Sequence, residues 1–284
     1  MSVQTKAILQ KVKELAVLPQ VVYQVLELTN NPNATARDLE RVISIDQGMS
    51  ARVLNTVNSA YYGLPRKIAS IKDAVVLLGF KTIRNLAMTA SVFDLFVGKT
   101  DRQNLRRGKW WRHSIDAALC CRLIASQLSD LSPDEAYTAG LLHDIGKPLL
   151  DRYGDAPYEE VESLMELGVS ELQAEREVFG CDHAELGREI SLHWGFPEKL
   201  AEAIGAHHAE SAIGLSEPRL TALTALGNLI AHWLRLPDHA EDEFLFSIPP
   251  WIYETLHLQP NNLRPLKLAC EAELHSSPLH ALTR

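Results

Sequence analysis

The stretch G140-L-L-H-D-I-G-K147 places a histidine beside an aspartate near the end of a helical segment. Upstream, S132-P-D-E135 combines an N-cap serine, a proline at the first helical position and a glutamate that can complete a capping box. Small residues recur at helical spacing between the two stretches, so His143 is expected on the buried face of the helix. Gly146 and Pro148 are expected to end it.

Helix signals recur along the rest of the chain, whereas strand signals do not. Apolar residues at helical spacing over 15–28 predict one helix, which N31-P-N33 ends. Gly79 separates a short apolar segment from a further predicted helix over 83–96. Polar capping residues predict three more helix starts: Thr35 with Asp38, Asp46, and Ser70 with Asp73.

These signals predict an all-α protein with two helical lobes. The composition becomes polar and basic over 98–108, which is typical of a boundary between lobes, and a helix of the second lobe is expected to start at Trp110. We therefore expect an N-terminal lobe over 1–105, a second lobe over 106–240 and a C-terminal helical extension over 241–284. The extension should contain a helix over 263–273.

The composition indicates a globular protein that can bury a core, with 284 residues and 46% hydrophobic content. Its four cysteines include no C-x-x-C pair, which argues against a zinc ribbon or a disulfide framework. No segment resembles a signal peptide or an apolar membrane span. We expect a cytoplasmic protein without a membrane span.

Charge is distributed unevenly along the chain. The net charge is −8, yet residues 66–112 hold eleven Lys and Arg against three acids, which gives +8 there and −16 elsewhere. Either this segment forms a basic surface for an anionic partner, with Arg106 and Arg107 in it, or its charges simply solvate helix faces. The helices flanking Gly79 also fit a helix-turn-helix, but packing of a helical hairpin needs the same residues, so nucleic acid is not an expected partner.

Histidines gather in the second half of the chain. His113, His183 and the pair His207-His208 accompany His143, each near small residues that allow close approach. A lone histidine on a buried face is usually a core residue that bonds a carbonyl. Several imidazoles with one carboxylate can instead bind a transition metal, provided that different helices of a bundle bring them together.

Six motifs in this order resemble the HDOD family of bacterial signalling domains. They are L18-P-Q-V21, N55-T-V-N-S-A-Y-Y-G-L-P65, S70-I-K-D-A-V-V-L-L-G79, A139-G-L-L-H-D-I-G-K147, H183-A-E-L-G187 and H193-W-G-F-P-E-K-L200. The resemblance covers about 15–234. It implies an HDOD-specific N-terminal lobe followed by a lobe related to HD-type metal-dependent phosphohydrolases. It also implies an output or adaptor role in signal transduction, in two-component response regulation or cyclic-dinucleotide pathways.

Carried over by position, the resemblance implies a set of site residues. His113, His143 and Asp144 match the start of the HD ligand pattern, and His183, His207 and His208 match the additional ligands of its HD-GYP branch. Lys147 matches a phosphate-contacting lysine, so Asp144 and Lys147 are the catalytic candidates if the site is active. The implied cofactor is one or two divalent ions such as iron or manganese.

The chain departs from that pattern at its last ligand. The closing aspartate should fall in the helix over 220–234, but that segment offers only Asn228. A neutral amide is a weaker ligand than a carboxylate and adds no negative charge to a metal site. The G-Y-P loop after His207-His208 is also missing, so hydrolysis of cyclic dinucleotides is not expected.

Three functions fit these observations. The first, which we expect, is a regulatory protein that acts through contacts with other signalling proteins and carries a degenerate HD-type site. The second is a metal-dependent phosphohydrolase or phosphodiesterase on a nucleotide or cyclic nucleotide. The third is a sensor that binds a phosphorylated nucleotide without turnover.

Overall fold

The computed structural model describes residues 3–15, 23–25, 27–28, 31, 33–59, 62–96, 101–236 and 247–277. Helices form all the regular secondary structure of these residues, which confirms the predicted all-α class. The described residues include only part of the helix predicted over 15–28, and those at 23–25 and 27–28 are helical.

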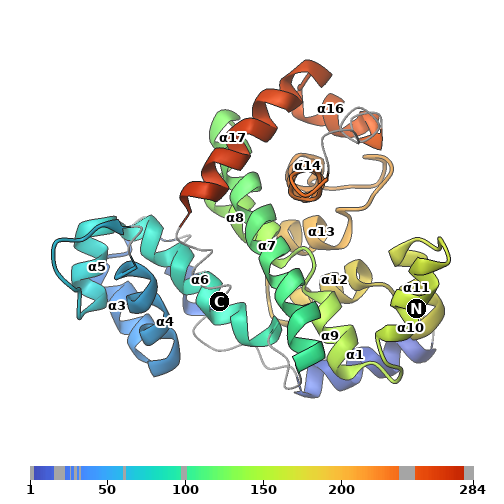
Figure 1. The fold of residues 1–284 in the computed structure, drawn as a ribbon, viewed down its shortest axis with the longest axis horizontal. Coiled ribbons are helices and arrows are strands. Elements are labelled where there is room, and N and C mark those ends of the chain that lie inside the picture. The colour runs from blue at the N-terminus through green and yellow to red at the C-terminus, as the bar shows by residue number, and fades with distance from the viewer. Residues whose placement is uncertain are drawn as a thin grey trace.

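Among the described residues, four helices of the N-terminal lobe lie together on one side of the molecule (Figure 1). They are α3 (Ala36–Ser44), α4 (Gln47–Val57), α5 (Ile71–Leu78) and α6 (Phe80–Phe96). The predicted caps are confirmed: Thr35 and Asp38 form a capping box, and the Asp46 and Ser70 side chains accept backbone N–H bonds of α4 and α5. Gly79 ends α5 with φ 84°, a left-handed value that glycine adopts without strain, and α6 follows at once.

The second lobe is built around the long helix α7 (Asp101–Gln127), which packs against α8 (Pro133–Leu142) and α14 (Pro218–Trp233). The other helices of this lobe are α9 (Gly146–Tyr153), α10 (Glu159–Glu166), α11 (Glu171–Phe179), α12 (His183–His193) and α13 (Glu198–Gly205). At the C-terminal end, α16 (Pro250–Leu256) packs against α14, and α17 (Leu263–Ser276), which follows the 3-10 turn η3 (Pro260–Asn262), packs against α7 and α14. The helix predicted over 263–273 is thereby confirmed as α17.

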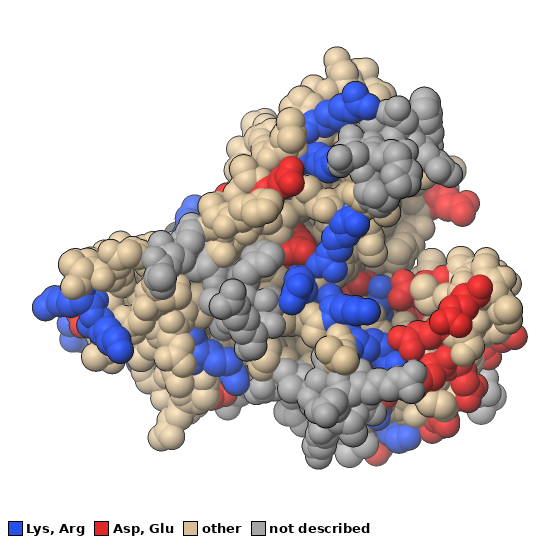
Figure 2. All heavy atoms as spheres, viewed as in Figure 1, with Lys and Arg blue, Asp and Glu red and all other residues tan. Residues whose placement is uncertain are grey.

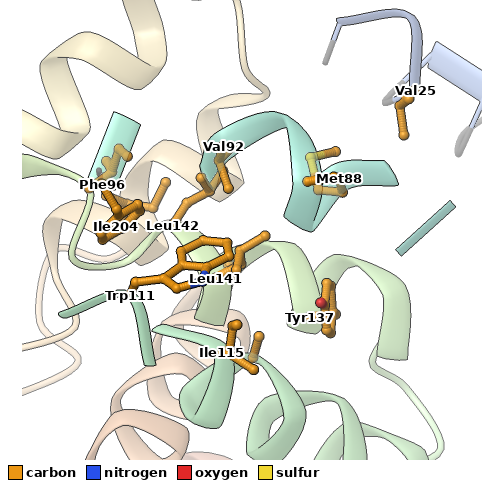
Figure 3. Close-up of a cluster of buried hydrophobic side chains, with 14 of the residues drawn as sticks. Val25, Met88, Val92, Phe96, Trp111, Ile115, Tyr137, Leu141, Leu142 and Ile204 are labelled. Atoms are coloured by element: carbon orange, nitrogen blue, oxygen red, sulfur yellow. The ribbon is translucent and has the colours of Figure 1, made fainter. Parts of the chain in front are cut away.

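The two lobes share one apolar core. Side chains of α6, including Met88, Val92 and Phe96, project toward α7 and α8 (Figure 3). The ring centroids of Phe96 and Trp111 lie 5.3 Å apart, within the range of favourable aromatic contacts. This packing holds the N-terminal lobe against the helix that carries His113.

The first helix, α1 (Val3–Leu15), lies beside the second lobe rather than beside α3–α6 (Figure 1). It packs against α9 and α12, and its Ile8, Leu9 and Val12 side chains are buried. Residues 3–15 therefore pack on the second lobe, whereas 36–96 build the first. The lobe limits at 105 and 240 stay predictions.

Two predicted helix boundaries are wrong. First, α7 begins at Asp101 rather than at Trp110, and Gly108 lies within it. Second, α8 ends at Leu142, and Gly146 and Pro148 belong to the first turn of α9 instead of ending a helix. Proline is tolerated in a first turn because the N–H that it lacks would have no partner within the helix.

Arg106 and Arg107 fit neither alternative for the basic segment, because they form no basic surface and do not solvate a helix face. Both side chains are buried and form ion pairs with Asp151, and Arg106 also pairs with Glu162. These ion pairs join α7 to α9 and α10. Figure 2 shows Lys and Arg side chains crossing the middle of one face, beside acidic side chains over α10 and α11.

None of the helices in the described part of the chain is long and apolar enough to cross a bilayer.

Candidate metal centre

The link between α8 and α9 carries the central pair of the site. His143 follows the last residue of α8, Asp144 comes next, and neither side chain is exposed. A Cβ on Gly146 would lie 2.0 Å from the carbonyl oxygen of His183, so only glycine lets α9 approach the start of α12 this closely. This contact brings His183 to the His143–Asp144 pair.

Backbone carbonyls fix two of the imidazoles. Nδ1 of His143 lies 2.7 Å from the carbonyl oxygen of Gly140, and Nδ1 of His207 lies 2.6 Å from that of Ile204. A carbonyl can only accept, so Nδ1 carries the proton in each ring and Nε2 keeps its lone pair. Both Nε2 atoms are buried without a hydrogen-bond partner among the described residues. Histidines that bind metals are held in this way.

A carboxylate fixes the third imidazole. Glu175 Oε2 accepts from His183 Nδ1 at 2.7 Å and from the His183 backbone N–H at 2.8 Å, while Tyr158 donates its hydroxyl to Oε1 at 2.5 Å. Burial raises the pKa of Glu175, but His183 and the hydrogen bond from Tyr158 together outweigh burial and the net pKa is lowered. Burial lowers the pKa of His183, but Glu175 outweighs it and the net pKa is raised. Glu175 thus orients His183 with Nε2 toward Asp144.

Asp144 is the common neighbour of the imidazoles. Its Oδ1 lies 3.3 Å from His183 Nε2 and 3.7 Å from His207 Nε2, and its Oδ2 lies 3.4 Å from His143 Nε2 and 3.8 Å from His113 Nε2. Burial raises the pKa of Asp144, but the neighbouring imidazoles, with His143 first, and the Lys147 ammonium outweigh burial and hold the net pKa well below its ordinary value. The carboxylate is therefore ionised, as a metal ligand must be.

Burial also keeps most of the histidines neutral. It is the largest cause that lowers the pKa of His113, His207 and His208, and it lowers that of His143 to about 3. Neutral imidazole is the form that coordinates a cation.

Lys147 brings a positive charge to the same carboxylate. Its Nζ lies 2.9 Å from Asp144 Oδ2 and 3.0 Å from Glu171 Oε2. Burial lowers the pKa of Lys147, but Asp144 and Glu171 outweigh it and the net pKa is raised. A buried ammonium is thus fixed beside the shared carboxylate.

Asn228 lies on α14 where the resemblance expects an aspartate, and its Oδ1 lies 2.8 Å from His113 Nε2. The imidazole nitrogen that would face a cation is therefore engaged with a neutral amide. His232, one turn along α14, stacks on His113 with ring centroids 4.2 Å apart.

The donor atoms fall into two groups that share Asp144. The first group is Asp144, His183, His207 and His208, and the second is His113, His143 and Asp144; in each, the donor atoms lie within 4.8 Å of one another. Imidazole nitrogens with one carboxylate suit first-row transition metals. The inward-facing Nε2 atoms and Asp144 Oδ1, which has no hydrogen-bond partner among the described residues, fit such a cation.

The structure thus brings all eight predicted site residues together: His113, His143, Asp144, Lys147, His183, His207, His208 and Asn228. His208 is the exposed member of the group. Sequence reasoning missed Glu171, Glu175 and Tyr158. A signal existed for Glu175, since it lies at helical spacing on the face of α11 that buries Phe179.

Comparison with known proteins supports the motif-based expectation. The HDOD domain model matches residues 15–210. An uncharacterised protein of Treponema pallidum is 24% identical over 212 residues, and the match covers 71% of this chain and 39% of that protein. Ribonuclease Y of Desulfotalea psychrophila is 32% identical over 99 residues, which cover 35% of this chain and 14% of the enzyme. The chain thus spans less than half the length of these curated relatives.

Solved structures show the same fold over nearly the whole chain. An HDOD domain protein of unknown function from Geobacter sulfurreducens has a TM-score of 0.77 and 26% identity, covering 96% of this chain and 98% of that one. A protein from Shewanella amazonensis, provisionally described as a phosphohydrolase, has a TM-score of 0.73 and 29% identity with the same coverage. The family match over most of the sequence leads to one conclusion: the chain belongs to the HDOD domain family.

Proposed function

We propose that this chain is a regulatory protein of signal transduction whose metal centre has one complete position for a divalent cation and one degenerate position. The supporting observation is the difference between the two donor groups. Asp144 with His183, His207 and His208 forms a complete set, whereas the His113 group meets Asn228 where a carboxylate is expected. An amide adds no charge to balance a second cation.

The centre then serves to bind a phosphorylated ligand. A divalent ion such as manganese or iron in the complete position would supply a Lewis acid toward phosphate oxygens. Lys147 is buried beside the shared carboxylate, and its ammonium can contact a phosphoryl oxygen there. With the second position degenerate, the ligand is retained rather than rapidly hydrolysed, and the occupied protein contacts other signalling proteins. A structure from Marinobacter aquaeolei with the same fold, provisionally described as a signal transduction protein, agrees with this role.

A second candidate is a metal-dependent phosphohydrolase. The specific observation in its favour is the buried Asp144–Lys147 pair at the junction of both donor groups. Its relatives point the same way, because they include the Shewanella protein and a ribonuclease Y over 99 residues. On this alternative, His113, His143 and Asp144 would hold a second cation, and His113 would bind it in place of its contact with Asn228.

Metal content and hydrolysis distinguish these candidates. Protein purified without chelator or affinity metal is analysed by elemental mass spectrometry and titrated with Mn²⁺ by calorimetry. The regulatory proposal expects about one ion per chain and negligible hydrolysis of bis(p-nitrophenyl) phosphate. Asn228→Asp should raise the content toward about two ions and increase hydrolysis, because it restores the acidic ligand.

Two controls make the outcome specific. Asn228→Ala removes the contact with His113 without adding charge and should not gain an ion. His193→Ala changes an exposed histidine of α12 outside the cluster and should bind Mn²⁺ like the wild type. About two ions with rapid hydrolysis in the wild type would favour the hydrolase, and a wild type that binds no ion would refute both.

A further inference from the structure

A pocket with a volume of ≈410 Å³ lies beside the metal centre, between α11, α12 and the end of α13. Its size falls within the range of about 300–1,000 Å³ that is usual for small-ligand sites. His208 lines this pocket, and its Nε2 lies 3.2 Å from Nε2 of His183. A ligand held in the pocket can therefore extend to the complete metal position.

Small residues form one wall of the pocket: Ala184, Gly205, Ala206 and Ala209. The side chain of Arg188 lies directly against Gly205, since a Cβ at that glycine would be 2.7 Å from Arg188 Cβ and Cδ. The Arg188 side chain is 49% exposed, and its guanidinium pairs with Glu189 at 2.8 Å. The pocket thus has a shallow wall of small side chains beside a planar cation.

Both arginines that line this pocket form ion pairs with carboxylates. Arg176, which is 60% exposed, pairs with Asp182, the N-cap of α12. Glu185 also lines the pocket, and its half-buried carboxylate has no described hydrogen-bond donor, although its backbone N–H bonds to Asp182. A phosphate in the pocket itself would meet both carboxylates and would compete for arginines that are already paired. The pocket instead suits an uncharged group that offers donors to a carboxylate.

We infer that this pocket binds the base of a nucleotide whose phosphate lies at the metal centre. The inference rests on the proposed function and names the class of its ligand. A guanidinium plane stacks on aromatic rings, as Arg188 can do, and a carboxylate accepts from the amino group of a base, as Glu185 can do. The wall of small residues leaves room for a flat ring, and His208 marks the side on which the phosphate lies.

The test compares GMP with ribose 5-phosphate and inorganic phosphate by calorimetry on the full chain loaded with Mn²⁺. GMP should bind roughly tenfold or more tightly than ribose 5-phosphate, because only GMP carries a base that can stack on Arg188 and donate to Glu185. Arg188→Ala and Glu185→Ala should each remove most of that advantage and leave affinity for ribose 5-phosphate and Mn²⁺ unchanged. Glu198→Ala, an exposed acid in the first turn of α13, is the matched control and should match the wild type.

The outcomes separate the inference from the function on which it rests. If ribose 5-phosphate binds in a Mn²⁺-dependent way but GMP binds no more tightly, the base pocket is refuted and the proposed function stands. If none of the three phosphates binds to the loaded protein, the proposed function fails and the inference fails with it. An unchanged advantage of GMP in both pocket variants also refutes the pocket, provided that their far-UV circular dichroism matches the wild type.

Discussion

Glu175 shows how one residue outside the donor groups determines the state of the site. Its two oxygens accept three hydrogen bonds, from the ring and backbone of His183 and from Tyr158. A carboxylate behind a ligating histidine fixes the ring and makes its other nitrogen more basic. The role of Glu175 is therefore to position His183, and the effect should be visible in metal affinity.

Glu175→Gln tests this role because the amide keeps the size of the side chain and removes its charge. Removal of such a partner typically costs 10–100-fold in metal affinity, so we expect a loss of roughly that size for Mn²⁺ by calorimetry. Glu177→Gln, an exposed neighbour on α11, should bind Mn²⁺ like the wild type. Equal affinities in the two variants would show that Glu175 serves packing alone.

Contacts between helices hold the site together. Two glycines allow the effect of such a contact on stability to be distinguished from the effect of helix propensity. Gly146 lies where α9 meets the first residue of α12, whereas Gly108 lies on the exposed face of α7 with nothing within 4 Å of an added Cβ. Alanine favours a helix over glycine at both positions by about 0.5–1 kcal/mol. Only at Gly146 does the added methyl group meet backbone.

Gly146→Ala should therefore lower the free energy of unfolding by about 1–3 kcal/mol, the usual cost of overpacking a core. Gly108→Ala should raise it by roughly 0.5–1 kcal/mol, because it adds helix propensity without a clash. Urea unfolding followed by circular dichroism measures both. A Gly146→Ala variant as stable as the wild type would mean that α9 and α12 can separate without cost.

The helices differ in how far their sequences predict them. Helix starts are predicted correctly at Ser132, at Asp46 and at the Thr35–Asp38 pair. Capping depends only on residues within one turn of each other, so it can be recognised in the sequence. The sequence does not predict the start of α7, because a polar and basic segment is typical of a boundary between lobes. In the structure, Arg106 and Arg107 are instead buried in ion pairs with Asp151, more than forty residues away. The convergence of the histidines followed from family motifs. The roles of Glu175, which contacts His183, and of Glu171, which contacts Lys147, depend on tertiary contacts. Spacing in the sequence alone does not predict them.

At the scale of the whole molecule, α1 connects the start of the chain to the lobe that carries the site. It packs against α9, which contains Lys147, and against α12, which begins with His183. The helices that hold the metal centre are thus supported from a segment more than a hundred residues away. No pattern within 3–15 predicts this contact, because an amphipathic helix fits any apolar surface of suitable shape.

Ile8→Ala should weaken this support. The side chain is 2% exposed, and truncation of a buried isoleucine to alanine usually costs about 2–5 kcal/mol. Lys6→Ala, on the exposed side of α1, should change stability by less than about 0.5 kcal/mol. Thermal and urea unfolding check both variants, and a stable Ile8→Ala protein would show that α1 docks without contributing to the fold.

The position of α1 also has a consequence for synthesis on the ribosome. Its final surface includes α12, which ends at His193, so the helix leaves the exit tunnel long before its binding surface exists. At translation rates of about 5–20 residues per second, roughly 10–40 seconds separate the two events. During that interval Ile8, Leu9 and Val12 have no native partner on α12, and the nascent chain presents an apolar helix that a chaperone can hold.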